Sequence, residues 1–174
     1  METITGSLHP QADYQKVVRV AYRLIETYNL HRHPGEMIDI ASLFTYFDLR
    51  IMDLPPHIYG FTLDLERPDS KIIIALNSTM DTCQTRFVAG HELGHVALWH
   101  ESQFNECVMG KALFNRLEKE ATALSAYLLL PRQTVAQGLT GANNEILLDK
   151  IADWYKVPPQ LVLVRRALYA ATGY

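Results

Sequence analysis

The chain has 174 residues, which is enough for one well-buried domain and too few for two ordinary ones. Its formal net charge of −3 at pH 7 gives no positive field that would hold a phosphate backbone, so direct nucleic-acid binding is not expected. With 48% hydrophobic and 20% charged residues, the composition is that of a globular protein rather than a disordered one.

The first half of the chain changes from helical to extended patterns. Asp13 is a candidate N-cap for a helix with apolar residues on one face, and this helix should end near the sequence NLHRHPGE. A shorter helix is expected around residues 37–47. Three short β-type runs follow, namely LRIMDLPP, YGFTLDL and KIIIALN, and ERPDSK is expected to connect the last two as a hairpin.

The second half has helical spacing throughout. One helix is expected over residues 81–100 and another over residues 112–130, where Pro131 stops it. The last segment predicts a helix, a short turn at KVPP and a further helix. Strands followed by helices, without regular alternation, indicate an α+β fold.

The C-terminal segment resembles a helix-turn-helix in outline. We assign residues 1–142 to one domain and residues 143–174 to a helical pair that is expected to pack on it. Arg165 and Arg166 are the only clustered positive charge in this pair, which has four basic residues against three acidic ones. This balance favours a structural or substrate-docking role over contact with DNA.

Cysteine content and hydropathy bear on where the protein works. Cys83 and Cys107 are too few for a disulfide framework, which favours a reducing compartment. The N-terminal stretch METITGSLHPQADYQ has no apolar segment of the signal-peptide kind, and no run approaches the roughly 18 apolar residues of a membrane span. We therefore expect a cytoplasmic protein that makes no membrane contact.

The sequence RFVAGHELGHVALWH, residues 86–100, contains the motif HELGH, whose residue types can bind a metal ion. On a helix His91 and His95 project from one face one turn apart, so both imidazoles can bind one metal ion. Glu92 lies about 100° around the helix from His91, where its carboxylate can act on a water beside the metal. A zinc ion would lower the pKa of that water toward about 7, and the carboxylate would take its proton during attack on a carbonyl.

Two histidines on a core helix can also be ordinary packing residues, but their context favours a site. Phe87, Val88, Leu98 and Trp99 are expected on the same stripe as both histidines, which would then face the interior. Gly94 in mid-helix costs up to about 1 kcal/mol relative to Ala, which makes sense where a backbone or a substrate must come close.

A catalytic zinc site needs a third protein ligand, and the next helix offers two candidates. Glu118 and Glu120 flank its apolar stripe on opposite sides, and periodicity does not choose between them. Either carboxylate could also be simply solvated. The expected stripe consists of Leu117, Ala121, Leu124 and Leu128.

The run IYGFTLDLERPDSKIIIALNSTMDTCQTRFVAGHELGHVALWH, followed by LEKEATALSAYLLLP, resembles the ImmA/IrrE family of zinc metallopeptidases. The resemblance extends from the first helix to about Tyr169. It implies a reduced zincin fold, in which a small, mostly antiparallel sheet packs beside the HELGH helix and flanking helices.

The same resemblance implies roles for individual residues. His91 and His95 would bind one Zn²⁺ ion, Glu118 would be the third ligand, and Glu92 would be the general base. Thr122 stands where many members have Asn, and Leu130 stands where Met is usual. Both departures are expected to lie away from the metal ligands.

The resemblance further implies a zinc-dependent endopeptidase whose protein substrate is a helix-turn-helix repressor. The alternatives are a regulatory binding module with a structural or vestigial metal site, and a general peptidase. A substrate strand should pair with a sheet edge, and YGFTLDL is preferred over KIIIALN because Gly60 permits close backbone approach. The donor to the oxyanion is left open among Tyr59, His57 and His100.

Overall fold

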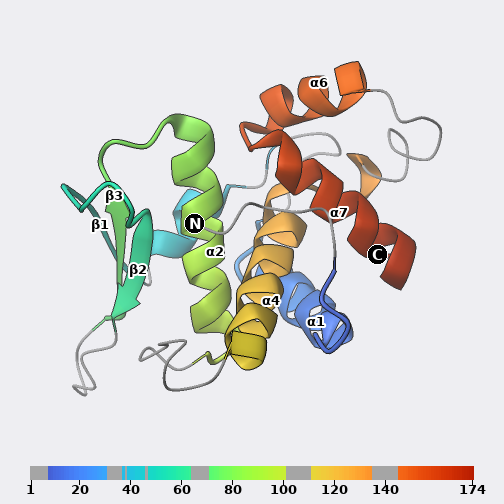
Figure 1. Cartoon of the computed structure of the whole chain (residues 1–174), viewed down its shortest axis with the longest axis horizontal. Coiled ribbons are helices and arrows are strands. Elements are labelled where there is room, and N and C mark those ends of the chain that lie inside the picture. The colour runs from blue at the N-terminus through green and yellow to red at the C-terminus, as the bar shows by residue number, and fades with distance from the viewer. Residues whose placement is uncertain are drawn as a thin grey trace.

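A three-stranded sheet lies on one side of helix α2 (Thr82–Ala97), and the other long helices lie on its far side (Figure 1). The computed structural model describes residues 8–30, 37, 39–45, 47–63, 71–100, 111–134 and 145–174. From the sheet outward, α2 is followed by α4 (Lys111–Leu129) and then by α1 (Tyr14–Thr27) and α7 (Pro159–Thr172). Helix α4 is therefore central, because it contacts α2, α1 and α7.

The sheet has the order β1-β3-β2 and is mixed. Strand β3 (Ile73–Asn77) runs antiparallel to β2 (Gly60–Leu63), as a hairpin requires, and parallel to β1 (Asp48–Met52). The expected α+β class is confirmed, and one of its two strand pairings is antiparallel. The ERPDSK connection lies outside the described residues except for Lys71.

Helices α1 and α2 begin where side chains satisfy free backbone N–H groups. The Asp13 carboxylate accepts from the Lys16 backbone N–H at the start of α1, and the helix ends just before NLHRHPGE. Asp81 and Gln84 form a capping box at the start of α2. The short helix expected over residues 37–47 is a 3₁₀ helix, η1 (Ile40–Thr45).

The core lies where α2 and α4 pack against β3, α1 and α7. Its side chains come from every layer. Helix α4 is covered by α2, α1 and α7, so its apolar residues are buried on several sides. Fully buried members from the different elements are Val17, Ala21, Ile74, Leu93, Ala121, Leu124, Leu128 and Leu168.

The expected placement of Trp99 on the buried stripe of α2 is wrong. Helix α2 ends at Ala97, and Trp99 has a left-handed backbone conformation with φ of 59°. This turn directs the indole outward, where it is 90% exposed, whereas Phe87, Val88 and Leu98 are buried as expected.

The C-terminal helices pack on the rest of the chain through α7, which contacts α4, α1 and α6 (Glu145–Tyr155). Arg165 is only 1% exposed, and its guanidinium donates to the carbonyls of Leu130 and Tyr174. It also lies 4.3 Å from the ring centroid of Tyr127. Arg165 is therefore a packing residue and not part of a basic surface, while the division of the chain at residue 142 stays a prediction.

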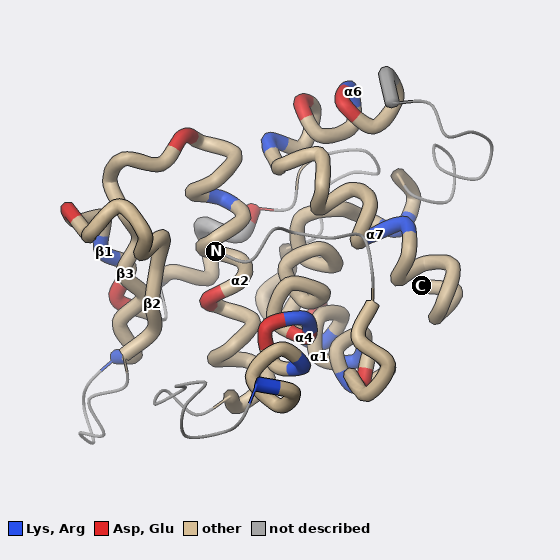
Figure 2. Tube along the Cα trace, viewed as in Figure 1, with Lys and Arg blue, Asp and Glu red and all other residues tan. Residues whose placement is uncertain are grey.

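Figure 2 shows charged residues of both signs close together in the first part of α4. No helix in the described ranges is long and apolar enough to cross a bilayer.

Candidate metal centre

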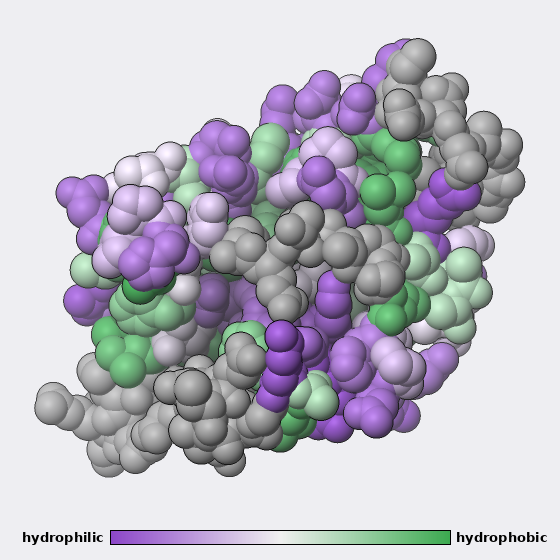
Figure 3. All heavy atoms as spheres, viewed as in Figure 1, coloured by the Kyte–Doolittle hydropathy of each residue, from purple (hydrophilic) through white to green (hydrophobic). Residues whose placement is uncertain are grey.

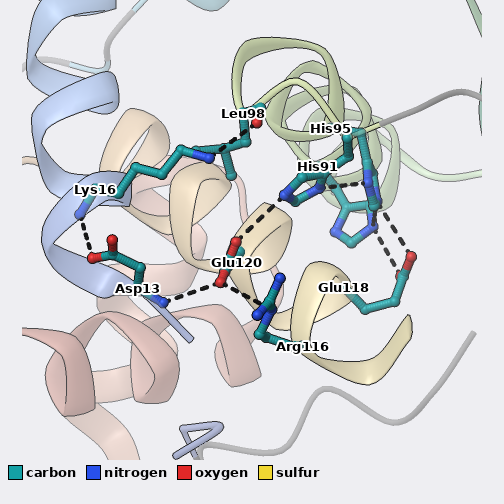
Figure 4. A network of polar contacts seen from close by, with 9 residues as sticks. Asp13, Lys16, His91, His95, Leu98, Arg116, Glu118 and Glu120 are labelled. Carbon is teal, nitrogen blue, oxygen red and sulfur yellow. Dashed lines mark hydrogen bonds and ion pairs between the residues drawn. The ribbon is translucent and has the colours of Figure 1, made fainter. Parts of the chain in front are cut away.

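Three donor atoms from α2 and α4 converge on one point. The Nε2 atoms of His91 and His95 lie 3.1 Å apart. The two carboxylate oxygens of Glu118 lie 3.2 Å from the Nε2 of His91 and 3.3 Å from that of His95 (Figure 4). The predicted third side chain thus meets the predicted pair, and all three are partly buried.

The size of this triangle fits a zinc ion. In a tetrahedral site with Zn–N and Zn–O distances of about 2.0–2.1 Å, neighbouring ligand atoms lie about 3.3–3.4 Å apart. The observed separations of 3.1–3.3 Å are close to that value. Within the described ranges, His91, His95 and Glu118 are the only group of His, Cys, Asp or Glu side chains that could hold a metal.

Two glycines of α2 allow Glu118 to come this near. A Cβ atom on Gly94 would lie 2.8 Å from the carbonyl oxygen of Ala121, and one on Gly90 would lie 2.6 Å from the Oγ of Ser125. Larger residues would push α2 and α4 apart, so the mid-helix glycine accommodates a neighbouring backbone. The expectation of a close approach at Gly94 is confirmed, and what comes close is α4.

The carboxylate of Glu92 contacts the sheet. The hydroxyl of Thr62 on β2 donates to the Oε2 of Glu92 at 2.9 Å. This bond joins the edge strand to the carboxylate that the sequence suggested as a general base. Thr62 was not singled out from the sequence, because nothing in YGFTLDL indicates which alternate side chains face α2.

The ring of His91 is oriented from its other nitrogen. Its Nδ1 lies 3.2 Å from the Oγ1 of Thr122, one turn along α4 from Glu118. When Nδ1–H donates to this hydroxyl, the lone pair of Nε2 points into the cluster. The expectation that Thr122 lies away from the candidate metal ligands is therefore wrong, because this side chain contacts His91.

Glu118 and Glu120 have different environments. Glu118 is at the cluster with a side chain that is 30% exposed, whereas the side chain of Glu120 is 6% exposed and faces His100. The Nδ1 of His100 in turn lies 3.0 Å from the Nδ1 of His95. Glu120, the alternative candidate for the third ligand, thus contacts His100 and not the three-donor cluster.

Electrostatics favours the charged form of Glu118. Burial acts to raise its pKa, but hydrogen bonds and charge from His91 and His95 outweigh burial and hold the pKa well below its usual range. Burial likewise acts to lower the pKa of His91, but Glu118 and then Glu92 raise it overall. Burial, followed by the charge of His95, lowers the pKa of His100 to about 3, so that its imidazole is neutral near pH 7.

The fold and this cluster agree with what similar sequences show. Residues 45–166 match the family model Peptidase M78, the IrrE N-terminal-like domain, and the chain belongs to this family of metallopeptidases. As a peptidase it acts on a protein substrate. A protein of Bacillus phage phi105, named "Uncharacterized immunity region protein 2", is 30% identical over 152 residues, which cover 85% of this chain and 87% of the phage protein.

Proposed function

We propose that this peptidase is a zinc-dependent endopeptidase that cuts a DNA-binding repressor of the helix-turn-helix type in the cytoplasm. The observation that carries the zinc assignment is the triangle of donor atoms from His91, His95 and Glu118, whose edges are 3.1–3.3 Å. The repressor is suggested by the family resemblance, and the name of the phage relative, an immunity region protein, is in keeping with a regulatory substrate.

A catalytic role for the metal is supported by the number of donors. Structural zinc sites are usually closed by four protein ligands, whereas catalytic sites have three and keep one position open. The described part of the chain offers three. This count favours an enzyme over a binding module whose metal is structural.

In the proposed reaction His91, His95 and Glu118 would hold the ion, and bound zinc would supply Lewis-acid activation of a water molecule and of the scissile carbonyl. The carboxylate of Glu92, held by the Thr62 hydroxyl, accepts the proton of the attacking water and returns it to the leaving amide nitrogen.

The sheet suggests how the substrate is held. Strand β3 is paired on both sides, so KIIIALN has no free edge, whereas β2 is an edge strand that carries Thr62 beside Glu92. An extended substrate segment would add to β2 through backbone hydrogen bonds. Gly60 itself is explained by packing and does not bear on the choice of edge, because a Cβ at this position would lie only 2.7 Å from a methyl carbon of Val88 on α2.

Side chains on the outer face of β2 provide apolar surface beside this edge. Figure 3 shows apolar surface over the strands, and Phe61 and Leu63 are 38% and 41% exposed. Alternate side chains of a bound segment could pack there. Backbone pairing would supply grip, and such apolar contacts would supply selectivity.

The test combines zinc analysis with cleavage of a repressor encoded beside the gene. We expect about one zinc per chain, a single cut, and complete loss of cleavage with a chelator. Glu92→Gln should keep the zinc and lose cleavage, while Glu26→Gln, at an exposed site on α1, should behave as wild type.

Three outcomes would contradict the proposal in different places. Cleavage by Glu92→Gln would remove the general-base assignment. A purified protein with no zinc, or with a closed four-ligand site, would favour the binding module. Digestion of many unstructured proteins would favour a general peptidase over one with a repressor as substrate.

A further inference from the structure

A line of buried polar side chains leads from His95 away from the donor cluster (Figure 4). The Nδ1 of His95 faces the Nδ1 of His100 at 3.0 Å, and the Nε2 of His100 faces the Oε2 of Glu120 at 3.4 Å. The side chains of His100 and Glu120 are only 3% and 6% exposed. Neither residue offers a donor atom to the cluster, so their burial next to a proposed ligand needs a reason.

The end of α2 places His100 under His95. Trp99 adopts the left-handed conformation, and the backbone N–H of His100 donates to the carbonyl of His95 at 2.9 Å. This is the hydrogen bond of a Schellman motif, which turns the chain back on the last helical turn. The Lys16 ammonium donates to the carbonyl of Leu98 at 3.2 Å and so fastens this turn to α1.

The other end of the line is fixed by the start of α1. The backbone N–H of Asp13 donates to the Oε1 of Glu120 at 3.0 Å, and the Nε of Arg116 lies 3.7 Å from the same oxygen. Asp13 lies before the region that matches the family model, residues 45–166. The N-terminal helix of this chain therefore contributes to the surroundings of the site.

The contacts from Glu120 through His100 to His95 favour one placement of hydrogen on the two imidazoles. The Nε2 of His100 lies 3.4 Å from an oxygen of Glu120, which is longer than a usual hydrogen bond, and the negative charge of a carboxylate there favours hydrogen on this nitrogen. The other nitrogen of a neutral imidazole is then a lone pair, and it can accept from the Nδ1–H of His95. With hydrogen on Nδ1, His95 would present a lone pair at Nε2, which is the form that metal binding requires, whereas without a metal the same Nε2 faces the carboxylate of Glu118 as a donor.

We propose that His100 and Glu120 are positioning residues that hold His95 in the tautomer and orientation with which its Nε2 binds zinc. The inference rests on the proposed zinc site and adds a supporting pair that extends to α1. Partners of this kind orient metal-bound histidines, and their removal typically lowers metal affinity about 10- to 100-fold.

The experiment measures the zinc dissociation constant by chelator competition, together with the melting temperature of the metal-free protein. His100→Leu removes the acceptor for His95 and should raise the dissociation constant about 10- to 100-fold. His100→Asn keeps an amide oxygen near the position of Nδ1, so it should restore affinity to near the wild-type value. A purely structural role for His100 would not separate these two variants in this way.

Glu120→Gln tests which nitrogen of His100 carries hydrogen, and it keeps the size of the side chain. The amide oxygen of Gln would stay on the Asp13 N–H, which leaves its NH₂ group facing His100. His100 would then have to turn its lone pair toward Gln and its N–H toward His95, which opposes the zinc-binding tautomer. We expect weaker zinc binding than in wild type, with Glu26→Gln as the matched control.

The outcomes separate this inference from the proposed function. A wild-type protein that binds no zinc contradicts both. Zinc binding that is normal in wild type and unchanged in His100→Leu and Glu120→Gln overturns the positioning role alone, as does an equal loss in His100→Leu and His100→Asn. If His100→Leu does not fold, Glu120→Gln and His100→Asn decide the question.

Discussion

Gly94 of α2 lies directly against the backbone of Ala121 of α4, so that a Cβ at position 94 would be 2.9 Å from the Cα of Ala121. This contact is one helical turn from both His91 and Glu118, which lie on the two helices that it joins. The distance between the helices at this point sets the distance between the histidine pair and the carboxylate. The glycine within HELGH therefore acts through packing.

We expect Gly94→Ala to destabilise the fold by about 1–3 kcal/mol, because the clash is with backbone and the two helices must separate. Zinc affinity should fall in the same variant, because Glu118 moves with α4. Gly90→Ala is the comparison, because its Cβ would meet the Oγ of Ser125, a side-chain atom that can turn aside at the cost of its buried hydrogen bond to the carbonyl of Phe87, so we expect a smaller loss of stability than in Gly94→Ala. Denaturant unfolding and zinc titration of both variants test this, and an unperturbed Gly94→Ala protein would contradict it.

The sequence was sufficient to place the two histidines on one helix face, and to predict most elements, because these depend on local spacing. His91 and His95 fall one turn apart on any helix, and Asp13 and Asp81 are recognisable N-caps. Glu118 could be chosen over Glu120 only by resemblance to a family. Which of the two carboxylates faces the histidines depends on how α4 is rotated against α2. The periodicity of one helix gives no information on that rotation.

The other differences between the expected and the observed structure come from tertiary contacts and from the position at which α2 ends. Periodicity placed Trp99 on the buried stripe, but the Schellman turn begins before that residue and reverses its direction. Thr122 and Thr62 reach His91 and Glu92 across element boundaries, at distances of 3.2 and 2.9 Å. No local pattern marks a threonine as the partner of a side chain in another element.

Thr62→Val should lower the rate of cleavage while zinc content stays the same. The valine fills similar space but cannot donate to Glu92, which loses the bond that orients it. General-base catalysis contributes about 10²- to 10⁴-fold, and we expect misorientation to remove about 10-fold of it. Thr62→Ser keeps the hydroxyl and should retain most activity, so equal kcat values for the Val and Ser variants would refute the role of this bond.

Tyr127 should make the fold sensitive to alkaline pH. Burial raises the pKa of its hydroxyl, although the bond to Thr172 and the charge of Arg165 oppose this. A group whose pKa is raised by folding contributes stability that is fully present below its unfolded pKa, here about 10, and is lost as pH rises through the folded value. Unfolding free energy should therefore fall above about pH 10.

The variant that checks this is Tyr127→Phe. It removes the contact with Thr172, at 2.9 Å, and should cost about 0.5–1.5 kcal/mol near pH 7. Its unfolding free energy should then decline less steeply than that of wild type in the alkaline range. Some decline should persist because burial also raises the pKa of Tyr14. Parallel curves for the two proteins would show that Tyr127 does not titrate during unfolding.

Trp99→Gly should stabilise the protein, although it removes a large side chain. A residue with a Cβ loses about 1–2 kcal/mol in the left-handed conformation, whereas glycine adopts it freely but has about 0.5–1 kcal/mol more chain entropy to lose on folding. Since the side chain of Trp99 is 90% exposed, little packing is lost, and a net gain of about 0.5–1 kcal/mol is expected.

Trp99→Ala separates the backbone effect from the loss of the indole. It also removes the ring but keeps the Cβ, so its unfolding free energy should stay near that of wild type. Because glycine favours the turn that carries His100, zinc affinity should be preserved in Trp99→Gly. Equal destabilisation of the Gly and Ala variants would mean that the indole makes stabilising contacts, and that these contacts outweigh the strain of the left-handed turn at this position.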